Sequence, residues 1–179
     1  MTPERYRALR AALDAHPAAK HTVIALNRWL PVVPFVCYPV LIVLLNVQWF
    51  ALLGGSDQAA TLAQAQEIGK AILVPAITFA IGTAMRAKLD RPRPYEQPGF
   101  EPLVEKKTKG KAFPSRHALS AAVLGAVWLY FYPAVGVAMT VVAAAICVLR
   151  VLAGVHAIRD VVFGAVLGFA LGAAGMCFL

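Results

Sequence analysis

One stretch of this sequence, Ala118 to Leu149, contains no Asp, Glu, Lys, Arg or His residue. As a single α-helix it would be about 48 Å long, whereas the hydrocarbon core of a bilayer is only about 30 Å thick. The run therefore predicts two helices joined by a turn, which we expect at Tyr132 to Gly136, where a proline interrupts the helical pattern. A hairpin of this kind returns Arg150 to the side of the membrane on which His117 lies.

The composition supports a membrane location for the whole chain. Of its 179 residues, 60% are hydrophobic and only 15% are charged. The mean hydropathy is +0.68, which is unusual for a soluble domain. The net charge of +8 indicates an anionic partner, such as a lipid headgroup or an anionic substrate. Nucleic acid is not expected, because the basic residues lie between apolar spans and no nucleic-acid-binding motif is present.

Three further segments are long and apolar enough to cross a bilayer, namely Pro31 to Leu53, Lys70 to Ala87, and about Ala157 to Leu179. Residues 58–69 form a polar, Ala- and Gln-rich connector between the first two, which is compatible with a short helix. The last segment has glycines at the spacing of closely packed membrane helices, which are Gly164, Gly168, Gly172 and Gly175. The sequence thus predicts an all-α integral membrane helical bundle of about five transmembrane helices, with residues 31–179 as the transmembrane domain.

Residues 1–30 form a separate segment in which charged residues interrupt the apolar ones. The apolar residues recur there at helical spacing, and Pro17 divides the stretch. No uninterrupted apolar run of about 20 residues is present. We therefore expect an amphipathic helix, or a pair of helices, that lies on the membrane surface.

Three polar clusters border the apolar segments. They are Arg86 to Pro94, Phe113 to His117, and Arg150 to Asp160. The five-span arrangement brings all three to one face of the membrane. Ionisable residues this close to membrane spans are functional by default, so we predict that the clusters form a single site.

The basic residues of these clusters suit an anion with several oxygen atoms. The planar guanidinium groups of Arg86, Arg93 and Arg150 are each able to bind two oxygens of a phosphate. Ser115 precedes a helix start, where its hydroxyl and the free backbone N–H groups are able to hold the same anion. We interpret these four residues as a phosphate-binding set.

The histidines supply the reactive groups. His156 and Asp160 are four residues apart, so on a helix they would share a face. The carboxylate is expected to accept the proton of one imidazole nitrogen, which leaves the other nitrogen free to attack an electrophile. His117 would then act as the general acid on the leaving oxygen. These side chains suffice for phosphoryl transfer without a metal.

Together, the three clusters resemble the signature of the type 2 phosphatidic acid phosphatase superfamily. That signature reads Lys, six residues, Arg-Pro; then Pro-Ser-Gly-His; then Ser-Arg, five residues, His, three residues, Asp. The matching positions here are Arg86, Arg93 and Pro94, then Pro114 to His117, then Arg150, His156 and Asp160. Three positions depart from it: Arg86 replaces Lys, Arg116 replaces Gly, and Leu149 replaces Ser. None of these changes removes a nucleophile or an acid.

The resemblance implies a membrane-embedded lipid phosphatase that needs no metal or other cofactor. The histidine of the third motif, here His156, would form a phosphohistidine intermediate, with Asp160 to orient it and His117 as the acid. The phosphate would be bound by Arg86, Arg93, Ser115, Arg116 and Arg150. The expected partners are the bilayer and a lipid phosphate that enters the site laterally.

The identity of the lipid stays open at this point. Phosphatidic acid, phosphatidylglycerol phosphate and a polyprenyl diphosphate are the candidates. A phosphotransferase that passes the phosphoryl group to an acceptor is an alternative to the phosphatase. A non-catalytic membrane protein that binds lipid phosphates is a second alternative, against which the intact His117, His156 and Asp160 argue.

Two arguments disagree on the side of the membrane that carries the site. Of the 17 Lys and Arg residues, all but Lys70 lie on the active-site face of the five-span arrangement. The positive-inside rule would put that face in the cytoplasm. Bacterial members of the family usually act at the outer face of the cytoplasmic membrane, however. We follow the resemblance and expect a bacterial cytoplasmic-membrane protein with its site on the outer face.

Overall fold

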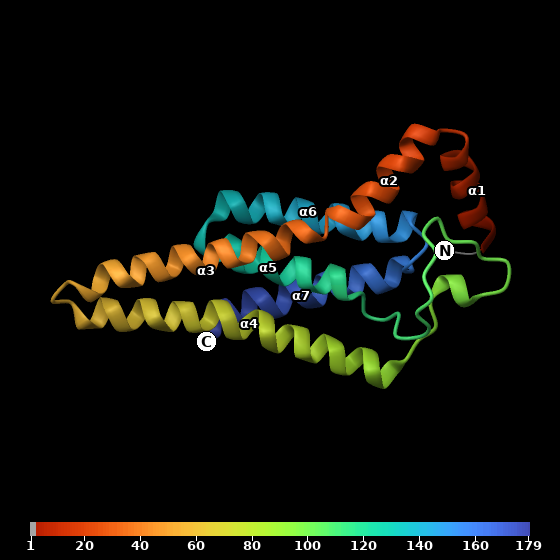
Figure 1. Ribbon diagram of the computed structural model, residues 1–179. Helices are drawn as coiled ribbons and strands as arrows, with labels where there is room; N and C mark the ends of the chain where they lie inside the picture. The colour runs from red at the N-terminus through yellow and green to blue at the C-terminus, as the bar shows by residue number, and fades with distance from the viewer. Residues whose placement is uncertain (1–2) are drawn as a thin grey trace.

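The structure is a computed structural model that describes residues 3–179, and all of its regular secondary structure over that range is helical (Figure 1). In chain order the elements are α1 (Pro3–Asp14), α2 (Pro17–Trp29), α3 (Val32–Leu53), α4 (Gln58–Leu89), the short 3₁₀-helix η1 (Pro94–Glu96), α5 (Arg116–Phe131), α6 (Pro133–Leu152) and α7 (Ile158–Phe178). The prediction of an all-α bundle is confirmed.

Within residues 3–179, four helical segments are long and apolar enough to cross a membrane, namely Pro17–Leu53, Gln58–Glu96, Pro133–Leu152 and Ile158–Phe178. The fifth predicted span, α5, has only 16 residues. Its residues from Ala118 to Trp128 are all buried, because α4, α6 and α7 pack around it. A helix that is apolar on every side is suited to such a central position, which explains the uncharged sequence. The chain is therefore an integral membrane protein built around α5.

The hairpin expected near residue 132 is present. Helix α5 ends at Phe131 and α6 begins at Pro133, where proline is favoured because the first turn needs no backbone donor. A Cβ on Gly136 would overlap the backbone of Leu129, so this glycine lets the two helices approach closely at the turn. The hairpin brings Arg150 back toward the end of the bundle where His117 lies, as predicted.

Glycines on α7 let this helix pack directly against α5. A Cβ on Gly164 would lie 2.8 Å from the carbonyl oxygen of Ser115, and a Cβ on Gly168 would collide with the carbonyl oxygen of Leu119. The close packing expected from the glycine spacing is therefore present. It also brings the beginnings of α5 and α7 together, where the backbone N–H of Ser115 donates a hydrogen bond to the carbonyl of Asp160 at 2.9 Å.

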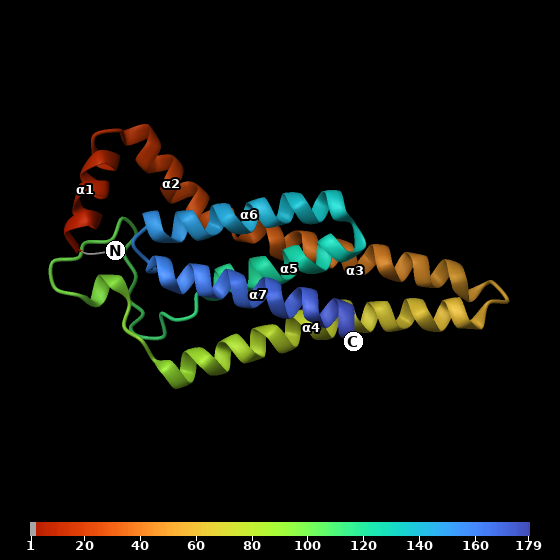
Figure 2. The ribbon, with the colours of Figure 1, turned by 180° about the vertical axis from the view of Figure 1, so that it is seen from behind.

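Helix α4 differs from the sequence prediction. Residues 58–69, expected as a connector, and the following span form one helix of 32 residues, about 48 Å long. The connector lacks proline and is rich in Ala and Gln, which favour helix. The Asp57 carboxylate also caps the start of the helix, because it accepts a hydrogen bond from the backbone N–H of Ala60 at 3.0 Å. The α3–α4 hairpin consequently extends beyond the other helices at the end opposite α1 (Figures 1 and 2).

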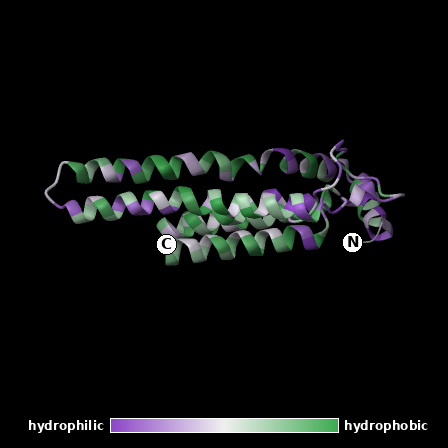
Figure 3. Cartoon of the chain, turned by 90° about the horizontal axis from the view of Figure 1, so that it is seen from below, coloured by the Kyte–Doolittle hydropathy of each residue, from purple (hydrophilic) through white to green (hydrophobic). Residues whose placement is uncertain are grey.

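The N-terminal segment is a pair of helices divided at Pro17, as predicted. Helix α1 lies at the end of the molecule where the long loop after α4 is found, and hydrophilic residues gather at that end (Figure 3). Although α1 is polar overall, its Tyr6 is buried, with 1% of its surface exposed. Its ring stacks on Phe100 of the long loop, with ring centroids 4.3 Å apart. Helix α1 is thus docked on the protein itself; the surface location of residues 1–30 stays a prediction.

Candidate active site

The three polar clusters of the sequence meet at one cavity of about 130 Å³. Its residues come from the end of α4, the start of α5, the end of α6 and the adjoining loops, which lie at the same end of the bundle (Figure 2). Its lining residues are Arg86, Arg93, Lys106, Thr108, Arg116, His117, Arg150, Val155 and His156. Six of the eight residues assigned to the site from the sequence therefore share this cavity, and only Ser115 and Asp160 do not line it.

The third cluster is built on a tight turn after α6. Gly154 adopts a φ of +72°, a conformation that glycine reaches without strain. The turn lets the backbone N–H groups of Val155 and His156 donate to the carbonyl of Arg150, at 3.2 and 3.3 Å. Arg150 is 4% exposed and His156 is also 4% exposed. This turn therefore holds the guanidinium and the imidazole at the same cavity.

The expectation that His156 and Asp160 share a helical face is wrong in one respect. His156 lies in the bend before α7, and only Asp160 is helical, because the turn at Gly154 delays the helix start to Ile158. Their Nδ1 and Oδ2 atoms are still 3.7 Å apart, which is longer than a hydrogen bond. The same Oδ2 accepts the backbone N–H of Ala157 at 3.0 Å. Asp160 thus caps α7 and faces the imidazole as well.

The surroundings of His156 favour its neutral form. Burial lowers the pKa of this histidine, and the positive charges of Arg93 and Arg86 act in the same direction; the nearby Asp160 carboxylate opposes them. Burial is the largest of these effects. These surroundings therefore favour the unprotonated imidazole, which has a free lone pair.

Hydrogen bonds join the first cluster to the second and to the loop that precedes it. Arg86, in the last turn of α4, donates from Nη1 to the carbonyl of Pro114 at 2.7 Å. Arg93 donates from Nε to the carbonyl of Gly110 at 3.1 Å. Both arginines are nearly buried, and these bonds to carbonyls leave further N–H groups of each guanidinium at the cavity. The arginines are therefore oriented before any anion binds.

In the second cluster Ser115 is the N-cap residue of α5, as expected, but its hydroxyl does not cap the helix. The side chain is fully buried, and its Oγ has no hydrogen-bond partner among residues 3–179. Arg116 and His117, at the beginning of α5, line the cavity instead. The binding role assigned to the Ser115 hydroxyl stays a prediction. The Nε of Arg150 is likewise buried and without a partner in this part of the chain, as suits a donor to an anion.

Three lining residues were not assigned to the site from the sequence, namely the polar Lys106 and Thr108 and the apolar Val155. Lys106 begins a run of four lysines between residues 106 and 111, and such runs usually lie at the membrane interface. The sequence gives no reason to assign Lys106, rather than one of the neighbouring lysines, to the site. Only the path of the loop after η1 brings it to the cavity.

Among residues 3–179, no three His, Cys, Asp or Glu side chains lie close enough together to hold a metal ion. The cysteines Cys37, Cys147 and Cys177 are all free thiols. The expectation of a reaction without a metal nevertheless stays a prediction.

Residues 68–179 match the PAP2 superfamily. The chain belongs to this family. Its fold is similar to that of LpxE from Aquifex aeolicus, with a TM-score of 0.67 and 18% sequence identity over 98% of this chain and 94% of LpxE. It is also similar to the first transmembrane PAP2 type phosphatidylglycerolphosphate phosphatase from Bacillus subtilis, with a TM-score of 0.53 and 23% identity over 97% and 91% of the two chains. None of the curated protein sequences matches it.

The family predicted from the three clusters is thus confirmed, and so is the transmembrane fold. At these identities the two solved structures establish a shared fold. Membership of the PAP2 superfamily, together with the membrane-spanning helices, supports a phosphatase that acts on a lipid at a membrane.

Proposed function

We propose that this PAP2 protein hydrolyses a lipid phosphate or diphosphate through a phosphohistidine intermediate at His156. The observation that carries the proposal is that the cationic cavity shares two lining residues with a neighbouring cavity that also has aromatic walls. Arg116 and His117 line the cavity and also a second one of about 210 Å³, together with Phe35, Phe79 and Ser120.

The second cavity shares lining residues with a third one, which is lined mostly by apolar side chains. Phe35, Phe79 and Ser120 also line a third cavity of about 320 Å³ between α3, α4 and α5, which includes Tyr38 and Leu124. A phosphate bound among the arginines would therefore have an apolar path open to its attached chain. This combination fits an amphipathic ligand that enters from the bilayer.

In the proposed reaction, Nε2 of His156 attacks phosphorus while the bond from phosphorus to the leaving oxygen breaks. His117, protonated when the phosphate anion binds beside it, donates this proton to that oxygen. Water then attacks the phosphohistidine, the N–P bond breaks, and His117 takes up a proton from the water, which releases inorganic phosphate. Asp160 faces Nδ1 of His156 at 3.7 Å, which favours the tautomer with its lone pair on Nε2.

The arginines would stabilise the charge that develops on the phosphoryl oxygens. Arg86, Arg93 and Arg150 come from three different segments and converge on the cavity. Donors that are fixed before the reaction stabilise its transition state more than mobile ones. Phosphatidic acid, phosphatidylglycerol phosphate and a polyprenyl diphosphate are the candidate substrates, and the second is named for the Bacillus subtilis structure.

The test is phosphate release by the detergent-purified protein from a panel of these lipids, without an added acceptor. His156→Ala should abolish release, whereas His21→Ala, which changes an exposed histidine of α2, should not. Release that continues in His156→Ala would refute the nucleophile. No release until an acceptor is added would indicate a phosphotransferase, and lipid binding without either reaction would indicate a binding protein. The same assay in EDTA tests the metal-independent reaction, which should proceed undiminished.

We further propose a bacterial cytoplasmic membrane and an outer-face site, in keeping with the resemblance to bacterial members. Lys107→Cys, in a background without the three native cysteines, provides the test in intact cells. A membrane-impermeant maleimide should label this position without cell lysis. Labelling only after lysis would put the site in the cytoplasm.

A further inference from the structure

The loop between η1 and α5 is fixed on both sides of Lys106. Before Lys106, Val104 N donates to the carbonyl of Ala153 at 3.4 Å, in the turn that leads to His156. After it, Gly110 N donates to Oε1 of Glu96 at 2.7 Å, and the Gly110 carbonyl accepts from Arg93. The segment from 104 to 110 is therefore attached to both the third and the first cluster.

Thr108 is held by a further contact within this segment. The hydroxyl of Tyr95 donates to the Thr108 carbonyl at 2.6 Å and lies 3.1 Å from its Oγ1. Lys106 and Thr108 thus reach the cavity from a fixed piece of backbone. Lys106 is exposed, but partial desolvation lowers the pKa of its ammonium group, and so do the charges of Arg150 and Arg93, which is consistent with a position near those guanidiniums.

The charge at the cavity exceeds what one phosphoryl group requires. The lining includes five basic side chains and no carboxylate: Arg86, Arg93, Lys106, Arg116 and Arg150. Two nearby carboxylates lie outside this lining: Asp160 caps α7 and faces His156, and Glu96 accepts from the N–H groups of Arg93 and Gly110. A phosphate monoester carries at most about two negative charges. The remaining positive charge favours a more anionic headgroup.

We propose that Lys106 and Thr108 form a subsite for a second anionic group of the substrate, next to the phosphoryl group that His156 attacks. The inference rests on the proposed function, and it specifies the substrate class as a lipid with a diphosphate headgroup. The terminal phosphorus is transferred and its bond to the bridging oxygen breaks. The lipid monophosphate leaves with the proton from His117, while Lys106 neutralises the charge on this leaving group.

The test compares the diphosphate and the monophosphate of one short-chain prenol, which share the same apolar chain. Lys106→Gln should lower kcat/KM for the diphosphate by about tenfold, as expected for one charge-assisted hydrogen bond, and change the value for the monophosphate by less than about twofold. Lys106→Arg should retain most of the activity on the diphosphate.

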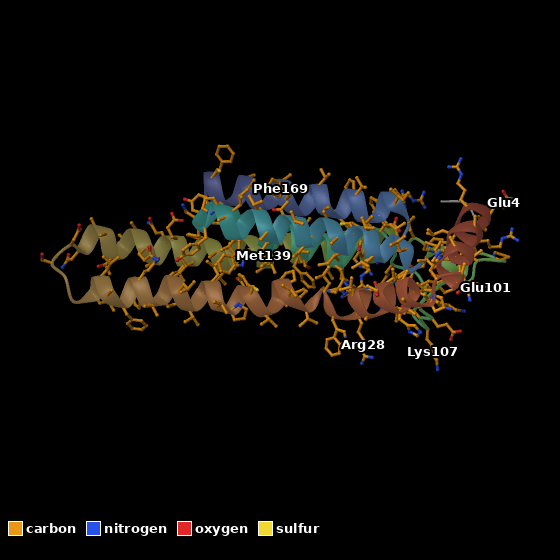
Figure 4. All side chains as sticks on the ribbon, turned by 90° about the horizontal axis from the view of Figure 1, so that it is seen from above. Glu4, Arg28, Glu101, Lys107, Met139 and Phe169 are labelled. Carbon is orange, nitrogen blue, oxygen red and sulfur yellow. The ribbon has the colours of Figure 1, made fainter. Side chains whose placement is uncertain are left out.

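The matched control is Lys107→Gln, which removes the same charge from the neighbouring position. Lys107 is exposed at the end of the molecule near α1 (Figure 4) and does not line the cavity, so it should leave both substrates unaffected. Equal losses on the two substrates in Lys106→Gln, or equal losses in both Gln variants, would overturn the subsite. Circular dichroism and size-exclusion chromatography of each variant show whether it is folded.

A second measurement separates this inference from the proposed function. If the wild-type protein hydrolyses neither lipid, the proposed function fails, and the subsite is tested by calorimetric binding of inorganic pyrophosphate and inorganic phosphate to the same purified protein. Tighter binding of pyrophosphate that is lost in Lys106→Gln would support the subsite. Equal affinity for the two anions, or a preference that survives the substitution, would refute it.

Discussion

The hydroxyl of Tyr6 donates a hydrogen bond to the backbone carbonyl of Leu152 at 3.1 Å, four residues before His156. The same oxygen accepts the backbone N–H of Leu103 at 3.0 Å. Arg10, one turn further along α1, forms an ion pair with Glu101 at 2.9 Å. Helix α1 therefore joins the turn that carries His156 to the loop that carries Lys106, although it lies outside the cavity.

Tyr6→Phe removes this hydroxyl and keeps the ring that stacks on Phe100. Because the partly buried N–H of Leu103 then loses its acceptor, we expect a loss of about 1 kcal/mol in unfolding free energy. The loop and the turn should also lose their mutual position, so kcat/KM should fall while the protein remains folded. Thermal unfolding in detergent and lipid phosphatase kinetics measure the two effects. Tyr130→Phe, at an exposed tyrosine, is the control; a Tyr6 variant that behaves like it would contradict a positioning role.

Gly154→Ala tests the same contact by changing the turn residue that faces the Tyr6 hydroxyl. Gly154 has a φ of +72° and Gly99 a φ of +74°, but a Cβ on Gly154 would lie 2.5 Å from the Tyr6 hydroxyl, whereas nothing lies within 4 Å of a Cβ on Gly99. Both alanine variants should lose about 1–2 kcal/mol through left-handed backbone strain. Only Gly154→Ala should in addition displace Tyr6 and lower kcat/KM. Equal kinetics for the two folded variants would show that the contact with Tyr6 does not matter to the reaction.

The pH dependence follows from the neutral state required of His156. Burial lowers its pKa below the ordinary value of 6.5, and protonation removes the attacking lone pair. Activity should therefore persist as the pH falls through 6.5 and decline only at lower pH. Because the Asp160 carboxylate raises the pKa of His156, Asp160→Asn should move this acid limb to still lower pH, with a lower maximum rate. A profile of kcat/KM against pH for both proteins measures this, and an acid limb at or above the ordinary histidine value would count against His156 as the nucleophile.

Most of the site was predictable because its signals are local. The three clusters are recognised by residue type and spacing alone, and the uncharged run fixes the hairpin that brings Arg150 toward His117. The glycines of α7 indicate a close helix contact for the same reason, since a missing side chain is visible in the sequence. These features therefore predict which ends of the helices lie together.

The residues that the sequence did not reveal depend on contacts between distant segments. Nothing near Tyr6 indicates that its hydroxyl lies between Leu103 and Leu152, since these partners are far away along the chain. Lys106 resembles an interface lysine until the loop is seen to be fixed at both ends. Ser115 is buried where its backbone N–H donates to the carbonyl of Asp160 and where Gly164 leaves no room for a Cβ beside its carbonyl, so its separation from the cavity is a consequence of packing.

The contact between α5 and α7 can be tested with two helical glycines. A Cβ on Gly168 would collide with the carbonyl of Leu119, whereas a Cβ on Gly69, within α4, meets nothing within 4 Å. Gly69→Ala should raise the unfolding free energy by about 0.5–1 kcal/mol through helix propensity, with unchanged kinetics. Gly168→Ala should lower the unfolding temperature despite the same gain, because it pushes α7 away from α5. Since that displacement also separates Asp160 from Ser115, the activity of the folded Gly168 variant should fall; a variant as stable and active as Gly69→Ala would show that the two helices do not need this close approach.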